Sequence, residues 1–327
     1  MVLIRLLFPG KHKRKHEKRP SASYKNLTLG NPKKKRRQDG YKMEDSPKID
    51  SKTFCMSEYD ELKRVILCQP QYMTIREVIN ETQEHFKNEG IHIERALEQH
   101  GEFVKTLKDN GVEVILLPYH KKYPEQVFTR DIGFTLGQTI FVAKMATDVR
   151  AGEEDVLKQW LEDEEISYYN LAEDRIEGGD VVIDRDTIYV GLSNRTDQKA
   201  VEHLQRLLNQ FKVIPIPFKE KYLHLDCVFN VVSPEVALIY PKALTKKDID
   251  FFASRYELIE VSEEEQFQLG TNVLSIGNKR VLSMPINKKV NQQLRNHGFQ
   301  IIEVDITEII KSGGSFRCCT LPLVRVK

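Results

Sequence analysis

The segment 180–216, DVVIDRDTIYVGLSNRTDQKAVEHLQRLLNQFKVIPI, contains the repeating unit of this chain. Its first part, 180–190, predicts two short strands joined by a turn at 184–186. Apolar residues then follow helical spacing over 201–211, and the apolar run at 212–216 predicts a buried strand. The order of elements is therefore strand, strand, helix and strand, which makes this an α/β unit.

The same order of elements recurs before and after this segment. Further strand–turn–strand segments are predicted at 128–143, 226–240 and 272–284, and further closing strands at 112–117, 166–171, 256–261 and 299–304. Equivalent positions lie 49 residues apart once and then 46 residues apart three times, at Asp131, Asp180, Asp226, Asn272 and Cys318. Propeller blades of the common all-β kind have a similar period, but they carry four strands and no helix. We therefore expect small mixed sheets, each with a helix packed outside.

The two ends of the repeat predict how it closes. The first unit has a single opening strand, 62–68, and the chain ends in a lone strand, 316–326. Pairing these strands would complete the first unit and leave no open sheet edge. We therefore predict an α/β fold in which five ββαβ units form a closed, five-fold pseudosymmetric propeller. The alternative is an ordinary open α/β sheet.

Composition limits the classes of protein to which this chain can belong. The 327 residues are 40% hydrophobic, and we expect one catalytic domain at 51–327 after a basic tail at 1–50. The net charge is +2, but residues 1–42 hold fourteen Lys or Arg and two acidic residues. The body is therefore acidic, which disfavours nucleic-acid binding by it. No apolar run approaches the roughly 20 residues that span a bilayer, so a membrane-spanning protein is excluded.

The basic tail has too little apolar surface to offset chain entropy, so we expect it to be disordered. Three interpretations stay open: a nuclear-localisation or nucleic-acid-binding tail, a targeting peptide, and an upstream extension without a role, with Met43 or Met56 as the working start. The five cysteines of the chain are too few and too irregular for a disulfide scaffold and show no CxxC metal spacing. This usage indicates a reducing, cytoplasmic location.

Closure of the ring would bring distant residues together. Residues at equivalent positions of each unit would lie at the same height around the central axis. Asp131, Asp180, Asp226 and Cys318 are therefore expected to converge. Three acids near one thiol describe a site for a small, cationic, electrophilic substrate.

The stretch Gly313–Thr320 places two cysteines directly after a glycine-rich turn, where the backbone is open to close approach by a ligand. A nucleophilic cysteine needs a lowered pKa or a nearby base. Neighbouring strand residues face opposite sides, so only one of Cys318 and Cys319 is expected to line the site. The repeat spacing favours Cys318, and a buried structural cysteine is the alternative.

Three other motifs would bring polar groups to the same place. His224 and Asp226 are two residues apart at the start of a predicted strand, so their side chains should share a face. In the motif 177–180, EGGD, two glycines let the backbone turn tightly while both carboxylates stay near the axis. Asp131 opens another such strand. The respective alternatives are a satisfied core histidine, an acidic turn and a surface pair of Arg130 with Asp131.

Two arginines, Arg150 and Arg195, lie at predicted strand-to-helix junctions. A guanidinium at such a place could hold a substrate carboxylate through two parallel hydrogen bonds. The alternative for both residues is a solvated surface arginine.

Taken together, in this order and spacing, the motifs resemble the guanidino-group-modifying superfamily of arginine deiminases, dimethylarginine dimethylaminohydrolases and glycine amidinotransferases. The resemblance spans about residues 58–326 and implies the five-fold α/β propeller (pentein-like) fold. It implies hydrolysis of a C–N bond of arginine or an N-methylated arginine-like compound. A covalent cysteine amidino intermediate would give a ureido product and an amine or ammonia, without metal or cofactor. Alternatives are an amidinotransferase, which passes the amidino group to an amine, and a non-catalytic binding protein on the same ring.

The resemblance also implies a role for each candidate residue. The implied roles are Cys318 as nucleophile, His224 as general acid and base, Glu177 as the acid that contacts the histidine and the guanidinium, Asp131 and Asp226 as carboxylates that hold the guanidinium nitrogens, Arg150 and Arg195 as ligands of the substrate's α-carboxylate, and Glu125 as a substrate-contacting acid. The partner is then a small cationic guanidino compound, and the oligomeric state stays open, with a homodimer among the options.

Departures from the family patterns leave the substrate undecided. Dimethylarginine hydrolases usually carry a lysine in place of Asp226 and an acid in place of Arg130, so both positions favour a deiminase. The short body and Glu125 favour the dimethylarginine hydrolases.

Overall fold

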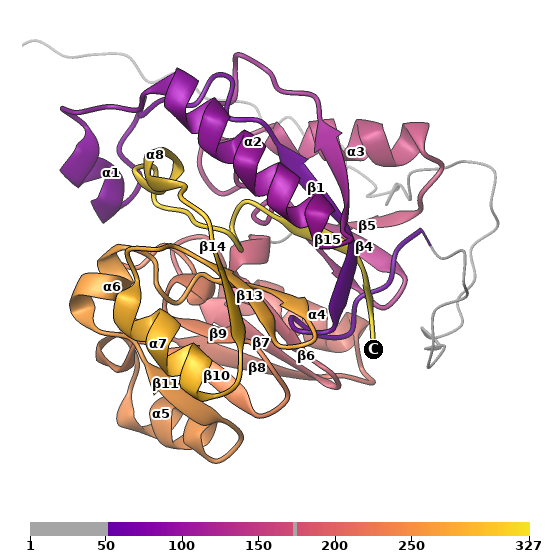
Figure 1. The fold of residues 1–327 in the computed structure, drawn as a ribbon. Helices are drawn as coiled ribbons and strands as arrows, with labels where there is room; N and C mark the ends of the chain where they lie inside the picture. Colours follow the sequence, from indigo (N-terminus) through magenta and orange to yellow (C-terminus); the bar gives the residue numbers. More distant parts are fainter. Residues whose placement is uncertain (1–51, 173–174) are drawn as a thin grey trace, which may run out of the picture.

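The computed structural model describes residues 52–172 and 175–327. The disorder expected for the basic tail, 1–50, therefore concerns residues outside the described part of the chain. In the described part, the strands form five sheets of three strands each, and Figure 1 shows these sheets with helices packed against them.

Each sheet corresponds to one predicted unit. The first comprises β15 (Leu321–Val326), β1 (Glu61–Cys68) and β2 (Glu113–Leu117), the second β3 (Gly133–Leu136), β4 (Thr139–Val142) and β5 (Tyr168–Asn170), and the third β6 (Val181–Asp184), β7 (Thr187–Leu192) and β8 (Lys212–Pro217). The fourth comprises β9 (Phe229–Val231), β10 (Val236–Ile239) and β11 (Glu257–Glu260), and the fifth β12 (Leu274–Gly277), β13 (Arg280–Ser283) and β14 (Gln300–Glu303). In every sheet the middle strand is antiparallel to the first strand and parallel to the third.

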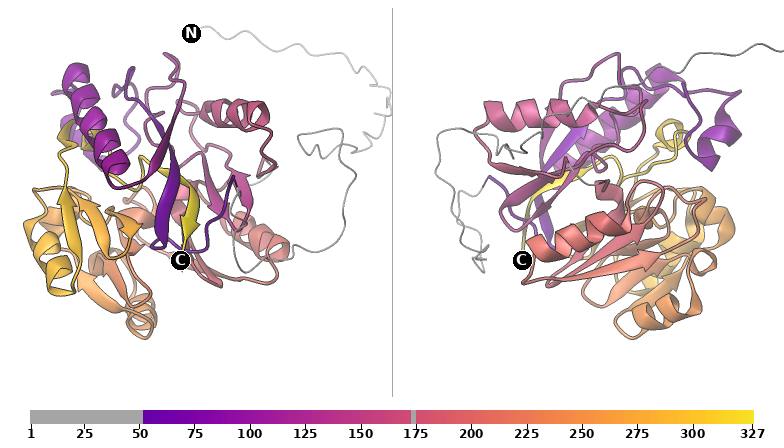
Figure 2. Two further views of the ribbon diagram at one scale, coloured as in Figure 1. Left: turned by 45° about the vertical axis from the view of Figure 1, so that its right-hand side comes forward. Right: turned by 180° about the vertical axis from the view of Figure 1, so that it is seen from behind.

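The predicted closure of the ring is confirmed. β15 pairs antiparallel with β1, from Glu61 opposite Val326 to Ile66 opposite Leu321. Both views in Figure 2 place these two strands side by side. The C-terminal strand thus completes the first unit, and the open α/β sheet is wrong because this pairing satisfies an edge that an open sheet would expose.

A helix connects the second and third strands of each unit. These helices are α2 (Ile93–Asp109), α3 (Glu153–Asp163), α4 (Gln198–Leu207), α5 (Lys246–Ala253) and α7 (Lys288–Asn296). The Asp197 side chain caps α4 by accepting a hydrogen bond from the Ala200 N–H at 3.0 Å. The helix buries Ala200, Val201 and Leu204, and full burial of a leucine stabilises the fold by roughly 1.5–3 kcal/mol.

Three short helices in the connections were not predicted. They are α1 (Glu81–Phe86), α6 (Glu263–Phe267) and α8 (Thr307–Ile310). Figure 1 shows α1 and α8 above α6 at one end of the ring. Helices of four to six residues contain too few turns to give a readable apolar periodicity.

The predicted starts of several strands are wrong. β9 begins at Phe229, and the preceding residues form a 3₁₀ turn, Leu225–Cys227. A second 3₁₀ turn, Gly178–Asp180, precedes β6. The Asp180 side chain accepts a hydrogen bond from the Leu225 N–H at 2.9 Å, and such side-chain bonds replace the ladder bonds of a strand. The site residues therefore lie in turns before the strands.

The same correction applies to the C-terminal strand, which begins at Leu321 rather than at residue 316. The Cys319 N–H donates to the Ser315 carbonyl at 2.9 Å, so the two cysteines lie in a turn. The alternation of strand side chains therefore does not apply to Cys318 and Cys319.

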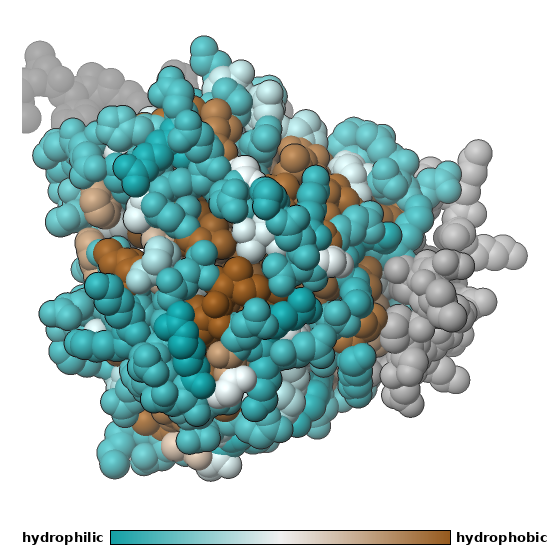
Figure 3. All heavy atoms as spheres, viewed as in Figure 1, coloured by the Kyte–Doolittle hydropathy of each residue, from teal (hydrophilic) through white to brown (hydrophobic). Residues whose placement is uncertain are grey.

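The surface in Figure 3 is mostly hydrophilic, with hydrophobic residues visible in a band across the middle of this face. Among the helices of the described residues, none is both long and apolar enough to cross a bilayer.

Candidate active site

The turns that precede the first strands of the sheets bring polar side chains from different units together. Asp131, Glu177, Asp180, His224, Asp226, Asn272 and Cys318 are each at most 1% exposed. Water is therefore largely excluded from these groups, and electrostatic interactions between them are stronger than at a surface.

The imidazole of His224 lies between two carboxylates. Its Nε2 is 2.8 Å from Glu177 Oε2, and its Nδ1 is 3.4 Å from Asp131 Oδ1. Burial alone would lower the pKa of His224, but Asp131, the hydrogen bond with Glu177 and the charge of Asp180 raise the pKa to about 10. At neutral pH the ring is therefore an imidazolium that can give up a proton.

The carboxylate of Glu177 is the counterion of this imidazolium. Burial would raise the pKa of Glu177, but the hydrogen bond and the charge of His224 lower it. Its Oε1 accepts a second hydrogen bond from the Ala146 N–H at 2.8 Å. Glu177 is thus held as an ionised acceptor that orients the ring.

The two glycines of the motif 177–180 are required by close packing. A Cβ atom on Gly179 would lie 2.6 Å from His224 Nδ1 and 2.7 Å from Asp131 Oδ1. A Cβ atom on Gly178 would lie 2.2 Å from the Arg130 carbonyl oxygen. A side chain at Gly179 would therefore push the imidazole away from Asp131, and one at Gly178 would collide with the neighbouring backbone.

The sulfur of Cys318 lies beside Asp226 and Asn272. It is 3.7 Å from Asp226 Oδ2, and it accepts a hydrogen bond from Asn272 Nδ2 at 3.1 Å. A hydrogen bond with Cys227, burial and the charge of Asp226 raise the pKa of Cys318 well above its ordinary value. Without a further cation, Cys318 is therefore a thiol at neutral pH.

Asn272 is a site residue to which the sequence analysis assigned no role. Its Oδ1 accepts a hydrogen bond from the Cys318 N–H at 3.1 Å, which fixes the orientation of the amide and directs Nδ2 at the sulfur. The repeat spacing was the available signal, because Asn272 occupies the position of Asp131 and Asp226 in its own unit. An amide in place of a carboxylate supplies a donor to the sulfur and avoids another negative charge.

A buried arginine holds Asp226. Arg317 Nη1 donates to Asp226 Oδ2 at 2.6 Å, and its Nη2 donates to Glu58 Oε1 at 3.0 Å and to the Val181 carbonyl at 2.7 Å. Glu58 also lies 3.6 Å from Arg130 Nη1. No sequence pattern predicted this network, because its members are distant in the chain and residues of these types are common at surfaces.

The two arginines expected to bind a substrate carboxylate make internal contacts. Arg150 Nη1 donates to Asp131 Oδ2 at 2.5 Å, and its Nη2 donates to Glu153 Oε2 at 2.8 Å. Arg195 Nη1 donates to Thr147 Oγ1 at 3.0 Å. Both guanidinium groups are buried near the site rather than solvated, and their contact with a substrate stays a prediction.

Glu125 joins the helix α1 to the loop that carries Cys318. It accepts hydrogen bonds from Gln83 Nε2 at 2.8 Å and from Ser312 Oγ at 2.9 Å. Burial raises the pKa of Glu125 to about 7, although Arg150 and the hydrogen bond of Ser312 oppose this shift. Glu125 therefore contacts the loop that leads to Cys318, and its contact with a substrate stays a prediction.

Among the buried side-chain atoms that lack a hydrogen-bond partner in the described residues are Asp131 Oδ1 and His224 Nδ1, which lie in this site. With Glu177 they form a group whose ligand atoms lie within 4.8 Å of one another, although the sequence showed no metal-ligand spacing. A histidine that binds a metal must be neutral, whereas Asp131 and Glu177 favour the protonated form of His224. The carboxylates are better suited to a cation that donates hydrogen bonds, such as a guanidinium.

Comparison with known proteins agrees with this arrangement. A family model described as "N,N dimethylarginine dimethylhydrolase, eukaryotic" matches residues 69–325. A Bacillus subtilis (strain 168) protein, YkgA, is 53% identical over 279 residues, which cover 85% of this chain and 98% of that protein. The bifunctional arginine dihydrolase/ornithine cyclodeaminase ArgZ of Synechocystis sp. is 26% identical, and the match covers 79% of this chain but 37% of ArgZ.

Solved structures show the same fold. The N-terminal domain of ArgZ, an arginine dihydrolase bound to its product, superposes with a TM-score of 0.75 at 26% identity and covers 81% of this chain and 98% of that domain. SxtG, an amidinotransferase from Microseira wollei, superposes with a TM-score of 0.72 at 18% identity and covers 84% of this chain and 97% of that chain; at this identity the likeness shows the fold alone. Because the family model matches most of the described residues, the chain belongs to the N,N dimethylarginine dimethylhydrolase family, within the superfamily of guanidino-group-modifying proteins.

Proposed function

We propose that the ring formed by residues 51–327 is a single catalytic domain that hydrolyses a C–N bond of arginine or an N-methylated arginine-like compound. The family and its relatives support a hydrolase of guanidino C–N bonds. The observation that carries the finer proposal is the burial of one thiol, Cys318, in the same site as a carboxylate-paired imidazolium, His224, and two further carboxylates.

Binding of the substrate cation is the first step. Asp131 Oδ1 and Asp226 would accept hydrogen bonds from the guanidinium nitrogens and localise its charge, which makes the central carbon more electrophilic. Arg150 already occupies Asp131 Oδ2, so Oδ1, which makes no hydrogen bond and lies 3.4 Å from His224 Nδ1, would be the oxygen that faces the substrate. The cation would also offset the negative charge near Cys318 and favour its thiolate.

The thiolate of Cys318 then attacks the central carbon and forms a tetrahedral adduct. His224, protonated in the free protein, donates its proton to the departing nitrogen, and the C–N bond breaks. The result is an amidino–thioether on Cys318 and a free amine or ammonia. Glu177 stabilises the imidazolium of His224 before the proton transfer and holds the neutral imidazole in place afterwards.

Hydrolysis of this intermediate uses the same histidine. His224, now neutral, accepts a proton from water, and the resulting hydroxide adds to the amidino carbon. Collapse of the second adduct breaks the C–S bond and releases a ureido product. Cys318 is restored, and the imidazole is protonated again.

A substrate panel tests this proposal. The purified protein is incubated with arginine, mono- and dimethylated arginine, agmatine and creatine, and ureido product, ammonia and methylamines are measured. We expect ureido product from at least one guanidine, together with an acid-trapped amidino adduct on Cys318. Transfer to an added amine without ureido product would indicate an amidinotransferase. Binding without turnover of every compound would contradict the proposal.

Replacement of Asn272 by aspartate tests the donor to the sulfur. The substitution keeps an oxygen for the Cys318 N–H, removes the Nδ2 donor and adds a negative charge. We expect kcat to fall by about 10²-fold, the lower end of the loss for one catalytic hydrogen-bond donor. The pKa of Cys318 should rise further, so the rate of its alkylation by iodoacetamide should reach its half-maximum at a higher pH.

Asn291→Asp is the matched control for this substitution. Asn291 is a buried amide on α7 that donates to the Met284 carbonyl at 2.9 Å. Its replacement should lower the melting temperature without moving the pH profile of alkylation. An unmoved profile in Asn272→Asp would remove the amide from the mechanism.

A further inference from the structure

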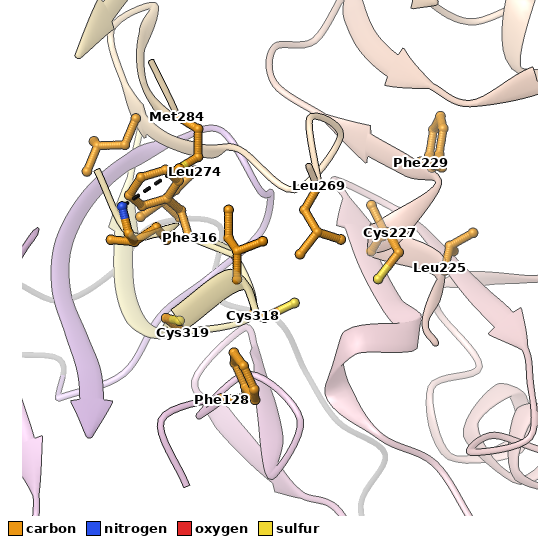
Figure 4. Packing of buried hydrophobic residues seen from close by; sticks show 14 of the residues in the cluster. Phe128, Leu225, Cys227, Phe229, Leu269, Leu274, Met284, Phe316, Cys318 and Cys319 are labelled. Carbon is orange, nitrogen blue, oxygen red and sulfur yellow. Dashed lines mark hydrogen bonds between the residues drawn. The ribbon is translucent and has the colours of Figure 1, made fainter. Parts of the chain in front are cut away.

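A second thiol, Cys227, faces the sulfur of Cys318. Cys227 Sγ lies 3.7 Å from Asp226 Oδ1, and Cys318 Sγ lies 3.9 Å from the same oxygen. Figure 4 shows the two sulfur atoms directed toward each other, although the residues lie in different turns. Both sulfur atoms thus lie within 3.9 Å of one carboxylate oxygen, which makes them neighbours in the site.

A pocket reaches one member of this pair, Cys227. The empty space of this pocket, open solvent included, is about 380 Å³, and its lining includes Asn80 before α1, Gly313, Leu269 after α6, and Cys227. In Figure 4, Leu269 and Cys227 lie on the side of Cys318 that faces away from Cys319. A molecule as small as hydrogen peroxide that enters the pocket can therefore reach Cys227, whose sulfur lies beside the same Asp226 oxygen as the sulfur of Cys318.

We propose that Cys227 is a resolving cysteine, which forms a disulfide with Cys318 when hydrogen peroxide oxidises the site. The sulfur of Cys318 attacks one peroxide oxygen, the O–O bond breaks, and Cys318 becomes a sulfenic acid while the other oxygen takes up the thiol proton and leaves as water. The Cys227 sulfur then displaces the sulfenic hydroxyl, an S–S bond forms, and a second water leaves. The two thiols lose two electrons, which reduce one peroxide to two waters.

The surroundings favour a disulfide as the end product. Asp226 opposes a negative charge on either sulfur, and the disulfide is uncharged. The mature disulfide also removes Cys318 from further oxidation to sulfinic and sulfonic acids, which thiols do not reverse. Oxidised protein would therefore be inactive but recoverable.

The other cysteines do not offer this pairing. Cys55 donates to the Pro322 carbonyl at 3.7 Å and Cys68 to the Gln69 carbonyl at 3.7 Å, so both are committed elsewhere. Cys319 is fully buried in the hydrophobic core next to Cys318. A disulfide between adjacent residues would also distort the turn that the Cys319 N–H stabilises.

The test treats the full-length protein with hydrogen peroxide and maps its peptides without reduction. We expect a cross-linked pair of peptides that contain Cys227 and Cys318, and a mass loss of two hydrogen atoms. Activity should fall with the appearance of this pair and return on addition of dithiothreitol. The cross-link is detected independently of turnover, so the inference rests on the proposed function only for the activity readout, and the two can fail separately.

Two variants complete this test. In Cys227→Ser, peroxide should drive Cys318 to sulfinic acid, and dithiothreitol should restore little of the variant's own starting activity. Cys319→Ser is the matched control and should still form the cross-link. If Cys227→Ser does not fold, as judged by thermal melting, Cys227→Ala takes its place. Sulfinic acid on Cys318 in the unmodified protein, or a cross-link to Cys319, would overturn the proposal.

Discussion

Replacing Cys318 by serine is expected to abolish turnover, with a loss in kcat of at least about 10⁴-fold, the scale for removal of a catalytic nucleophile. A serine hydroxyl has a far higher pKa than a thiol, and the carboxylate of Asp226, 3.7 Å from the sulfur, would oppose its ionisation further. The measurement is the rate of ureido product formation with the best substrate of the panel. Equilibrium binding of that substrate should persist, because the carboxylates are unchanged.

Cys319→Ser is the control for this substitution. Cys319 is as buried as its neighbour and packs in the same hydrophobic cluster, so its replacement tests packing alone. Most of the activity should remain, with a lower melting temperature. If Cys319→Ser is inactive and Cys318→Ser is active, the nucleophile has been assigned to the wrong cysteine.

Replacing Asp226 by asparagine is expected to weaken binding of a guanidinium substrate by about 2–5 kcal/mol, the scale for a buried charge pair that loses one partner. This corresponds to a roughly 30- to 5,000-fold increase in Kd. Asparagine keeps the shape of the side chain, but it presents no charge to the cation. The measurement is calorimetric titration with the Cys318→Ser protein as background, so that turnover does not interfere.

The substitution also leaves Arg317 without a carboxylate at Nη1, so a loss of stability is expected beside the loss of affinity. Asp184→Asn separates the two effects. Asp184 is a buried carboxylate that accepts hydrogen bonds from Tyr59 at 2.6 Å and Tyr256 at 2.5 Å, away from the site. The Asp184→Asn substitution should lower the stability of the protein and leave the Kd for the guanidinium substrate unchanged. An unaltered Kd in Asp226→Asn would remove Asp226 from the binding site.

The elements of the ring could be predicted because their signals are local. Apolar alternation and helical spacing within about forty residues identify each ββαβ unit, as in 180–216. The pairing of β1 with β15 could be predicted because each strand lacked a partner in its own unit. The exact starts of the strands could not be predicted. Side-chain hydrogen bonds, such as the one from the Leu225 N–H to the Asp180 carboxylate, compete with the backbone hydrogen bonds between strands.

The candidate site divides in the same way. The spacing of the repeat predicted that Asp131, Asp226 and Cys318 lie close together, because pseudosymmetry places equivalent positions around one axis. The side chains that hold these residues in place could not be predicted from the sequence. Arg317 holds Asp226 across 91 residues, and Glu58 holds Arg317 across 259 residues. No local pattern in the sequence predicts a contact between residues so far apart in the chain.

By itself, the sequence determined the repeating α/β architecture, its closure, and which thiol, imidazole and carboxylates share one region. Only the tertiary structure decided their charge states and pairings. It places His224 between two carboxylates, which raises its pKa to about 10, and it turns Arg150 onto Asp131. The reason is physical: a pKa and an ion pair depend on burial and on distances of a few ångströms between residues far apart in the chain, and these exist only after folding.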